Sequence, residues 1–232
     1  MTETYNGAHG IKAKIVAHSI AENPCGDGDI ELVTFEVEYP RMILAELNTH
    51  RMLSRNSASS RAIPFKKMKE QLTARPVRFG EANPGMQDKG VDYDKGVGIP
   101  PHYLVAGFDC TPEEAWVYAK ESAEGWAEAF YDAGYHKQVY NRLVEPFQMM
   151  KTVITATELN NFFWLRYHQA ADPTIMELAR AMRMALDHSE PKRLIPGEWH
   201  LPYVNASRDR EEHTSELQSH LNLVCRLLLE KK

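Results

Sequence analysis

Two segments near the start of the chain alternate between apolar and polar residues, and they constrain the fold more than any other feature. Residues 31–39 alternate cleanly, with Val33, Phe35 and Val37 on one face, and residues 11–20 alternate in part. The C-G-D-G-D sequence between the two segments has the composition of a turn. This pattern predicts a β-hairpin, or two neighbouring strands, with one face buried.

Helix start signals occur farther along the chain. Thr111 stands three residues before Glu114, with a proline between them, which predicts a helix N-terminus, and Gly134 marks the expected end of that helix. Asp172 before a proline predicts a second start, for a helix through residue 187. Shorter helices are expected at residues 42–47, 65–71, 136–144 and 160–168, and a further strand at residues 147–157. The expected fold class is therefore α/β or α+β, a mixed or antiparallel sheet with helices.

The chain has the length of one domain. Its 232 residues contain no repeat, and residues 75–102, rich in Pro, Gly and Asp, predict a long loop or insertion. We expect a single domain over residues 1–208. Residues 209–232 are interpreted as a non-native tail, because residues 211–220 resemble the translation of a sequencing-adapter oligonucleotide. The alternative is an amphipathic helix, since apolar residues in this tail have helical spacing.

Composition excludes several classes of protein. A net charge of −5 argues against a general nucleic-acid binder, and 43% hydrophobic with 25% charged residues is typical of a soluble globular protein. No apolar run approaches the length of a membrane helix, and the first ten residues lack the segments of a signal peptide. Cys25, Cys110 and Cys225 are scattered, so neither a metal site nor a disulfide framework is predicted. The expected location is the cytoplasm.

An acid-free basic stretch from residue 51 to residue 69 is the strongest candidate binding feature. Short hydrogen-bonding side chains are interleaved with its cations, and small residues let a ligand approach the backbone closely. Arginine forks and hydroxyls suit phosphate oxygens, so the stretch predicts a site for a polyanionic small molecule, the alternative being a solvated basic loop. The cations are Arg51, Arg55, Arg61, Lys66, Lys67 and Lys69, and the polar residues are Ser54, Asn56, Ser57, Ser59 and Ser60.

Residues 49–61, T-H-R-M-L-S-R-N-S-A-S-S-R, resemble the motif R-H-R-x-x-S-x-N-x-x-S-x-R of the flavin-dependent thymidylate synthases, the ThyX family. Only the leading Arg of the motif, which is Thr49 here, departs among the fixed positions, and Arg55 is a candidate replacement for that cation. The matching residues are His50, Arg51, Ser54, Asn56, Ser59 and Arg61. The resemblance covers residues 31–73 and 134–185.

Three polar residues in the second half of the chain match further positions of the family. Arg142 lies in an apolar helix pattern, and Asn161 and Arg166 have the spacing of the family's N-x-x-x-x-R pair. From the residues alone, each arginine could instead form a core ion pair, with Glu145 or Glu158, because an unpaired buried charge is very costly.

The resemblance implies a role for each matched position. Flavin binding is implied for Thr49, His50, Arg51, Asn56 and Asn161, and dUMP binding for Ser57, Ser59, Ser60, Arg61, Arg142 and Arg166. Arg166, Arg61 and Ser59 are the implied catalytic residues. The implied reaction converts dUMP to dTMP, with FAD, NADPH and methylenetetrahydrofolate. The family also implies a homotetramer with shared active sites. From the composition, we expect no metal, nucleic-acid or membrane partner.

Several positions depart from the family pattern. Glu46 stands where members often have Gln, Ser57 where many have Glu, and Ser60 where Gly is common. Thr155 and Thr157 replace an Asn and an Arg of the family's flavin-binding stretch. These departures leave two alternatives open: a related flavin and folate enzyme that modifies another pyrimidine nucleotide such as dCMP, and a non-catalytic protein that binds nucleotides or RNA.

Overall fold

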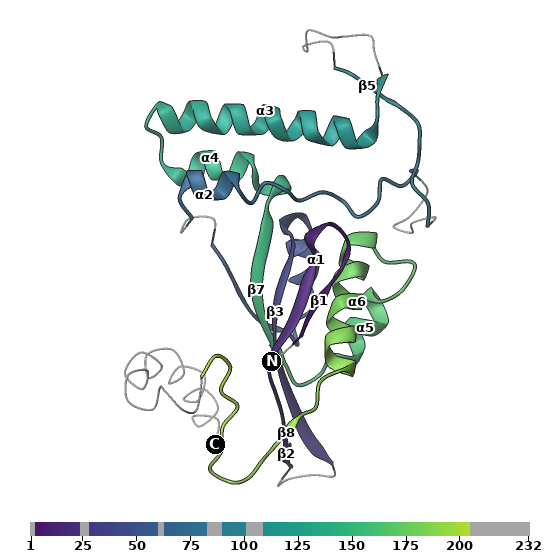
Figure 1. Cartoon of the computed structure of the whole chain (residues 1–232), viewed down its shortest axis with the longest axis vertical. Helices are drawn as coiled ribbons and strands as arrows, with labels where there is room; N and C mark the ends of the chain where they lie inside the picture. Colours follow the sequence, from purple (N-terminus) through teal and green to yellow (C-terminus); the bar gives the residue numbers. More distant parts are fainter. Residues whose placement is uncertain (1–2, 24–27, 60–62, 83–89, 101–108, 205–232) are drawn as a thin grey trace.

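The computed structural model describes residues 3–23, 28–59, 63–82, 90–100 and 109–204. Within these ranges the protein combines a six-stranded sheet, helices packed against it, a helical layer across one end of the sheet and a small two-stranded ribbon (Figure 1). The expected α+β class is confirmed. Predictions about Ser60, Arg61, Cys25 and the tail at residues 209–232 fall outside the described residues.

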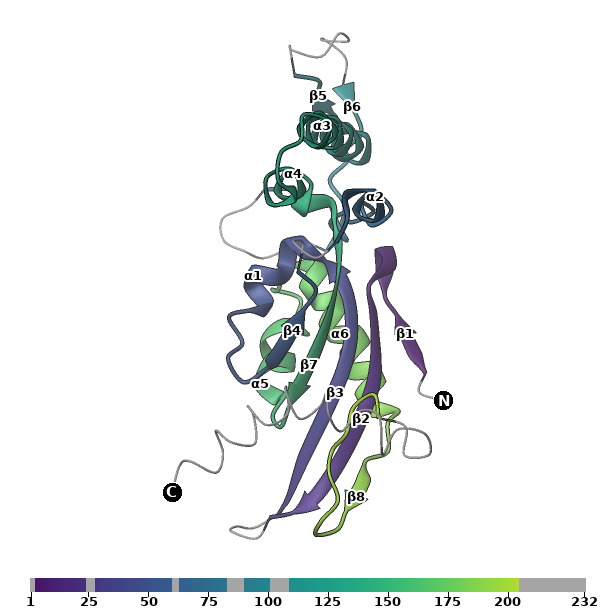
Figure 2. The same ribbon diagram turned by 90° about the vertical axis from the view of Figure 1, so that its left-hand side faces the viewer.

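The predicted hairpin forms the centre of the sheet. Strands β2 (Lys12–Glu22) and β3 (Asp29–Pro40) pair antiparallel, with Ile15 opposite Phe35, and a bulge follows Ile15. The strand order β1-β2-β3-β7-β4 is completed by β1 (Thr4–Asn6), β7 (Met149–Ala156) and β4 (Ser54–Ser57). β1 and β4 lie at opposite edges of this order (Figure 2). The sheet is mixed, because β8 (Lys192–Leu194) pairs with β2 in parallel.

The main core lies between the sheet and α6 (Pro173–Asp187). β3 buries Val33, Phe35, Val37 and Tyr39, as its alternation predicts, and α6 adds the fully buried Leu178. The start of α6 is also as predicted, because the Asp172 carboxylate accepts hydrogen bonds from the first-turn amides of Thr174 and Ile175. Two short helices complete this core: α1 (Leu44–Leu47), which continues the 3-10 turn η2 (Arg41–Ile43), and α5 (Asn160–Arg166).

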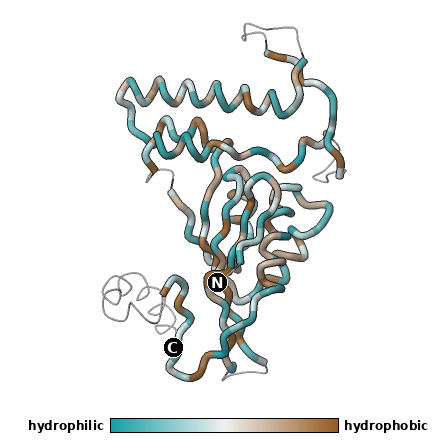
Figure 3. Tube along the Cα trace, viewed as in Figure 1, coloured by the Kyte–Doolittle hydropathy of each residue, from teal (hydrophilic) through white to brown (hydrophobic). Residues whose placement is uncertain are grey.

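A second apolar cluster holds the helical layer together. It joins α2 (Phe65–Lys69), α3 (Pro112–Asp132) and α4 (Lys137–Leu143), which is followed by the 3-10 turn η3 (Glu145–Phe147). Hydrophilic and hydrophobic residues alternate at short intervals along α3, as expected of a helix with one buried stripe (Figure 3). Thr111 and Glu114 form the predicted reciprocal cap at its start, and Gly134 follows its end with a φ of +80°.

The long loop predicted over residues 75–102 contains little regular structure in its described parts. Strand β5 (Val97–Gly98) pairs with β6 (Asp109–Cys110) in a separate two-stranded ribbon. A further 3-10 turn, η1 (Ala8–Gly10), connects β1 to β2. None of the helices in the described ranges is long and apolar enough to span a bilayer.

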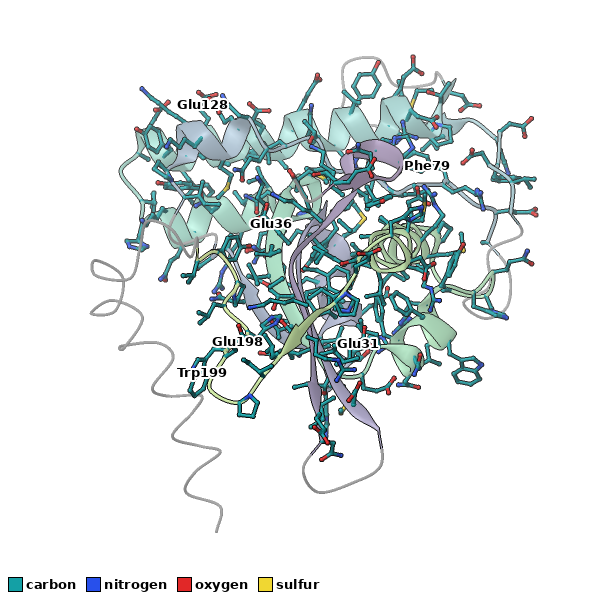
Figure 4. All side chains as sticks on the ribbon, turned by 60° about the horizontal axis from the view of Figure 1, so that its bottom comes forward. Glu31, Glu36, Phe79, Glu128, Glu198 and Trp199 are labelled. Atoms are coloured by element: carbon teal, nitrogen blue, oxygen red, sulfur yellow. The ribbon has the colours of Figure 1, made fainter. Side chains whose placement is uncertain are left out.

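The segment after β8 crosses the polar face of the sheet, opposite α6. His200 lies within 2.8 Å of the Thr34 hydroxyl and 2.9 Å of the Ser19 hydroxyl. Tyr203 donates to Glu36 at 2.9 Å, and burial, together with this carboxylate, raises the pKa of Tyr203 to about 12. Figure 4 shows Glu198 and Trp199 on this segment beside the strands. The sequence of this segment gives no signal for the parallel pairing of β8 with β2.

Candidate active site

A pocket of about 310 Å³ lies between the turn that follows α1 and the helix α5. Residues 49–53 line one side, and residues of α5 with the preceding Glu158 line the other. Five of the predicted site residues therefore share one pocket, although His50 and Arg166 are 116 positions apart in the chain. These five are Thr49, His50, Arg51, Asn161 and Arg166. The pairing of β7 with β3 and β4 produces this proximity, because α5 begins a few residues after β7 ends.

Three acceptors hold the guanidinium of Arg166. Its Nε donates to Nε2 of His50 at 2.9 Å, Nη1 donates to a carboxylate oxygen of Glu46 at 3.5 Å, and Nη2 donates to the Thr49 hydroxyl at 3.5 Å. All three acceptors belong to α1 or the turn after it. The remaining N–H groups of the fork stay available to a ligand, and the side chain is 22% exposed.

His50 accepts a hydrogen bond from Arg166 through an unprotonated ring nitrogen. It is buried and packs edge-on against Phe162, with the ring centroids 5.0 Å apart. A nitrogen that accepts a hydrogen bond from Arg166 carries no proton. Burial, and then the positive charges of Arg166 and Arg55, lower the pKa of His50 below its ordinary value, which favours the neutral imidazole.

Glu46 is the charged partner of Arg166. Its side chain is one-third exposed, and burial together with the negative charge of Asp172 raises its pKa, against the opposing effect of Arg166. The family motifs do not assign Glu46 to the site. The signal that could have identified it is its position four residues before His50, which brings both side chains to one face of a helix end.

Arg55 lies behind the pocket wall. Its Nη1 donates to the backbone carbonyls of Leu47 and His50 at 2.6 and 2.8 Å. Arg55 therefore satisfies carbonyls at the end of α1 and fixes the turn that carries the site. Arg55 is not among the residues that line the pocket, so its replacement of the family's cation at position 49 stays a prediction.

The basic stretch does not form one cationic surface in the described part of the chain. Arg51 lines the pocket, whereas Lys69 pairs with Glu124 and Glu128 of α3 at 3.0 and 3.3 Å. Lys66 and Lys67 are exposed on α2, in the helical layer. The clustering of cations in the sequence therefore overstates the positive charge that the pocket receives.

The remaining predicted residues of the motif lie along the edge of the sheet. Asn56 is exposed on β4. The Ser57 hydroxyl is 2.9 Å from that of Thr152, which is itself 2.8 Å from the Tyr39 hydroxyl, so Ser57 is joined to a polar chain inside the sheet. Ser59 follows β4 and is exposed. These residues do not line the pocket.

Arg142 lies on α4, in the helical layer and apart from α5 (Figures 1 and 2). Its side chain is exposed and forms no ion pair with any described residue. The two alternative core ion pairs, Arg142 with Glu145 and Arg166 with Glu158, are not formed among the described residues. Glu145 pairs with Arg41 at 3.0 Å, and Glu158 accepts from the Asn160 amide at the start of α5.

A shaped pocket with a few convergent polar groups is the usual form of a small-molecule binding site. The family model described as thymidylate synthase complementing protein matches residues 29–192, which is most of the chain. The chain belongs to this family, and the resemblance inferred from its motifs is confirmed. Family membership supports a thymidylate synthase-like function.

A solved structure adds one comparison. The chain is similar to the crystal structure of a UMP/dUMP methylase, PolB from Streptomyces cacaoi, bound with 5-Br UMP. The two share 20% identity over 67% of this chain and 69% of that chain, with a TM-score of 0.46. No curated protein matches the chain.

Proposed function

We propose that the protein is an FAD-dependent thymidylate synthase, which converts dUMP to dTMP with methylenetetrahydrofolate as carbon donor and NADPH as reductant. The observation that carries this proposal is the convergence of His50, Arg51, Asn161 and Arg166 on one pocket. These are positions that the family motifs assign to flavin and nucleotide, in a chain that belongs to the family.

The donors around the pocket fit part of a flavin nucleotide. Arg51 and Asn161 are exposed and line the pocket, and they offer a cation for a phosphate and an amide for a polar ring edge. A volume of about 310 Å³ is at the small end for ligand sites, so one subunit would enclose only part of FAD. When bound, the reduced flavin would supply the hydride that completes the methyl group.

The contribution of the protein would be electrostatic. Arg166 has free N–H groups and is held in position by His50, Glu46 and Thr49. A fixed guanidinium of this kind can bind the nucleotide and stabilise negative charge that develops on its pyrimidine ring. A cysteine nucleophile is not required in this scheme.

We further propose that the active site is shared between subunits of a homotetramer. Arg142 matches a dUMP-binding position of the family, yet it lies exposed on α4 and apart from the pocket. A second subunit could bring this arginine to the site. Arg142 would then neutralise part of the substrate's negative charge from across the interface.

We expect the protein to bind FAD and to oxidise NADPH faster when dUMP is present. Asn161→Ala should weaken FAD binding by about tenfold, the loss of roughly one hydrogen bond. Absorbance and fluorescence titrations with FAD measure the affinity, and Glu121→Ala, an exposed change on α3, is the control. A colourless preparation would not decide the question, because Thr49, Thr155 and Thr157 depart from the family. Failure to bind added FAD at high micromolar concentration would contradict the proposal.

A related enzyme that acts on another pyrimidine nucleotide is the second candidate. It is favoured by the contact between Thr49 and Arg166, because a departure from the family pattern here touches the proposed substrate residue directly. A non-catalytic RNA-binding protein is a weaker alternative, since the described cations of the basic stretch are divided between the pocket, the backbone and α3.

A further inference from the structure

We propose that Glu46 is a positioning residue for Arg166, and that its carboxylate takes up a proton when negative charge arrives at the guanidinium. This inference rests on the proposed function, because it takes dUMP as the anion that reaches Arg166.

The positioning part follows from the contacts of Arg166. His50 and Thr49 supply neutral acceptors for Nε and Nη2, and Glu46 supplies the one charged acceptor, for Nη1. Together the three contacts fix both the location and the plane of the fork. Removal of the Glu46 acceptor would leave Arg166 held along one side only, so the fork could rotate away from the pocket.

The proton part follows from the charges around Glu46. Arg166 approaches it from α5, and Asp172 lies near it at the start of α6. Burial, and then the charges of Arg166 and Arg55, lower the pKa of His50 in the turn after α1, and Arg55 itself donates to the backbone of that turn. Glu46 thus cancels the charge of Arg166, and Asp172 adds further negative charge. An arriving anion would meet a neutralised arginine unless the Glu46 carboxylate is protonated.

A protonated Glu46 can still hold Arg166. The proton comes from solvent and sits on one carboxyl oxygen, and the other oxygen continues to accept from Nη1. Burial and Asp172 already raise the pKa of Glu46, and a bound anion would raise it further. The complex then binds more protons than the free protein. The pKa of Glu46 is therefore higher in the complex than in the free protein. Between these two pKa values, affinity for dUMP should increase as the pH falls.

The experiment counts the protons taken up when dUMP binds to the full-length protein. Calorimetric titrations at mildly acidic pH, in buffers that differ in ionisation enthalpy, give this number directly. The phosphate of dUMP, with a second pKa of about 6, is present in every titration, so the difference between variants reports the contribution of Glu46. We compare the wild type with Glu46→Gln, which keeps the acceptor oxygen but cannot titrate, and with Glu46→Ala, which loses both.

Both variants should take up measurably fewer protons than the wild type. Glu46→Gln should bind dUMP at least as tightly as the wild type at neutral pH, whereas Glu46→Ala should bind severalfold more weakly because Arg166 is no longer fixed. Glu177→Gln is the matched control. Glu177 also pairs with an arginine, Arg180, but it lies on α6 beside η1, away from the pocket, so proton uptake should be unchanged.

Unchanged proton uptake in the Glu46 variants would overturn this inference and leave the proposed function standing. If one of the two Glu46 variants fails to fold, the proton uptake of the other still tests the inference. Wild-type protein that does not bind dUMP would overturn the proposed function, and this inference with it.

Discussion

Replacement of Arg166 by Ala should slow dUMP-dependent turnover strongly. The expected loss of transition-state stabilisation is on the order of 3 kcal/mol or more, the cost of removing an oxyanion donor. The guanidinium is the pocket cation with fixed geometry, held by Glu46, His50 and Thr49. Its loss removes the group that would stabilise charge on the pyrimidine ring. FAD binding should largely survive, because Arg51 and Asn161 are unchanged. NADPH oxidation with dUMP, set beside melting curves, measures both properties.

Arg166→Lys separates charge from geometry. The ammonium keeps the positive charge, but a single nitrogen cannot match three acceptors spread around a planar fork, so we expect weak dUMP binding and very slow turnover. Glu158→Gln serves as the control for stability, since Glu158 borders the same pocket without pairing with Arg166. An Arg166→Ala protein that is stable and fully active would contradict the assigned role.

Mixing two inactive variants should restore activity if the active site is shared. Arg142→Ala and Arg166→Ala should each abolish turnover alone. When the two chains are refolded or expressed together, hybrid sites that combine Arg142 from one subunit with Arg166 from another should give about a quarter of wild-type activity. Arg142 lies exposed on α4, so its substitution should not change the melting temperature.

The control in this mixing experiment is Glu121→Ala, a change at an exposed residue of α3, which should retain full activity on its own. A mixture no more active than its separate components would show that both arginines serve the same subunit. A fully active Arg142→Ala protein would remove Arg142 from the site altogether.

Elements with strong local signals could be predicted from the sequence. The alternation in residues 31–39 predicts the buried face of β3, and the capping residues Thr111 and Asp172 mark the starts of α3 and α6. In each of these elements the apolar pattern and the terminal residues favour the same structure. The tertiary fold confirms the local preference there and does not override it.

The elements that were missed depend on partners far away in the chain. Residues 54–57, S-R-N-S, contain no apolar residue, and they form strand β4 because the exposed edge of β7 provides hydrogen-bonding partners. The three-residue strands β1 and β8 likewise exist through pairing with β2. Strand formation of this kind follows from context more than from intrinsic preference.

The candidate site shows the same division. The motif spacing identifies Thr49, His50, Arg51, Asn161 and Arg166, which the fold brings to one pocket. The spacing of Glu46 from His50 could suggest that the two lie together, but the pairing of Glu46 with Arg166 spans 120 positions and has no local signal. The direction of Arg55, toward the carbonyls of Leu47 and His50, likewise depends on how the turn after α1 closes.

Product analysis tests the central claim most directly. The protein is incubated with dUMP, methylenetetrahydrofolate and NADPH, with and without added FAD, and the nucleotides are identified by mass spectrometry; dCMP is offered in a parallel reaction. The proposed function predicts dTMP from dUMP, in amounts that depend on FAD and fall to background in Arg166→Ala. Methylation of dCMP in preference to dUMP would favour the second candidate, and FAD-loaded protein that forms no methylated nucleotide from either substrate would contradict the account.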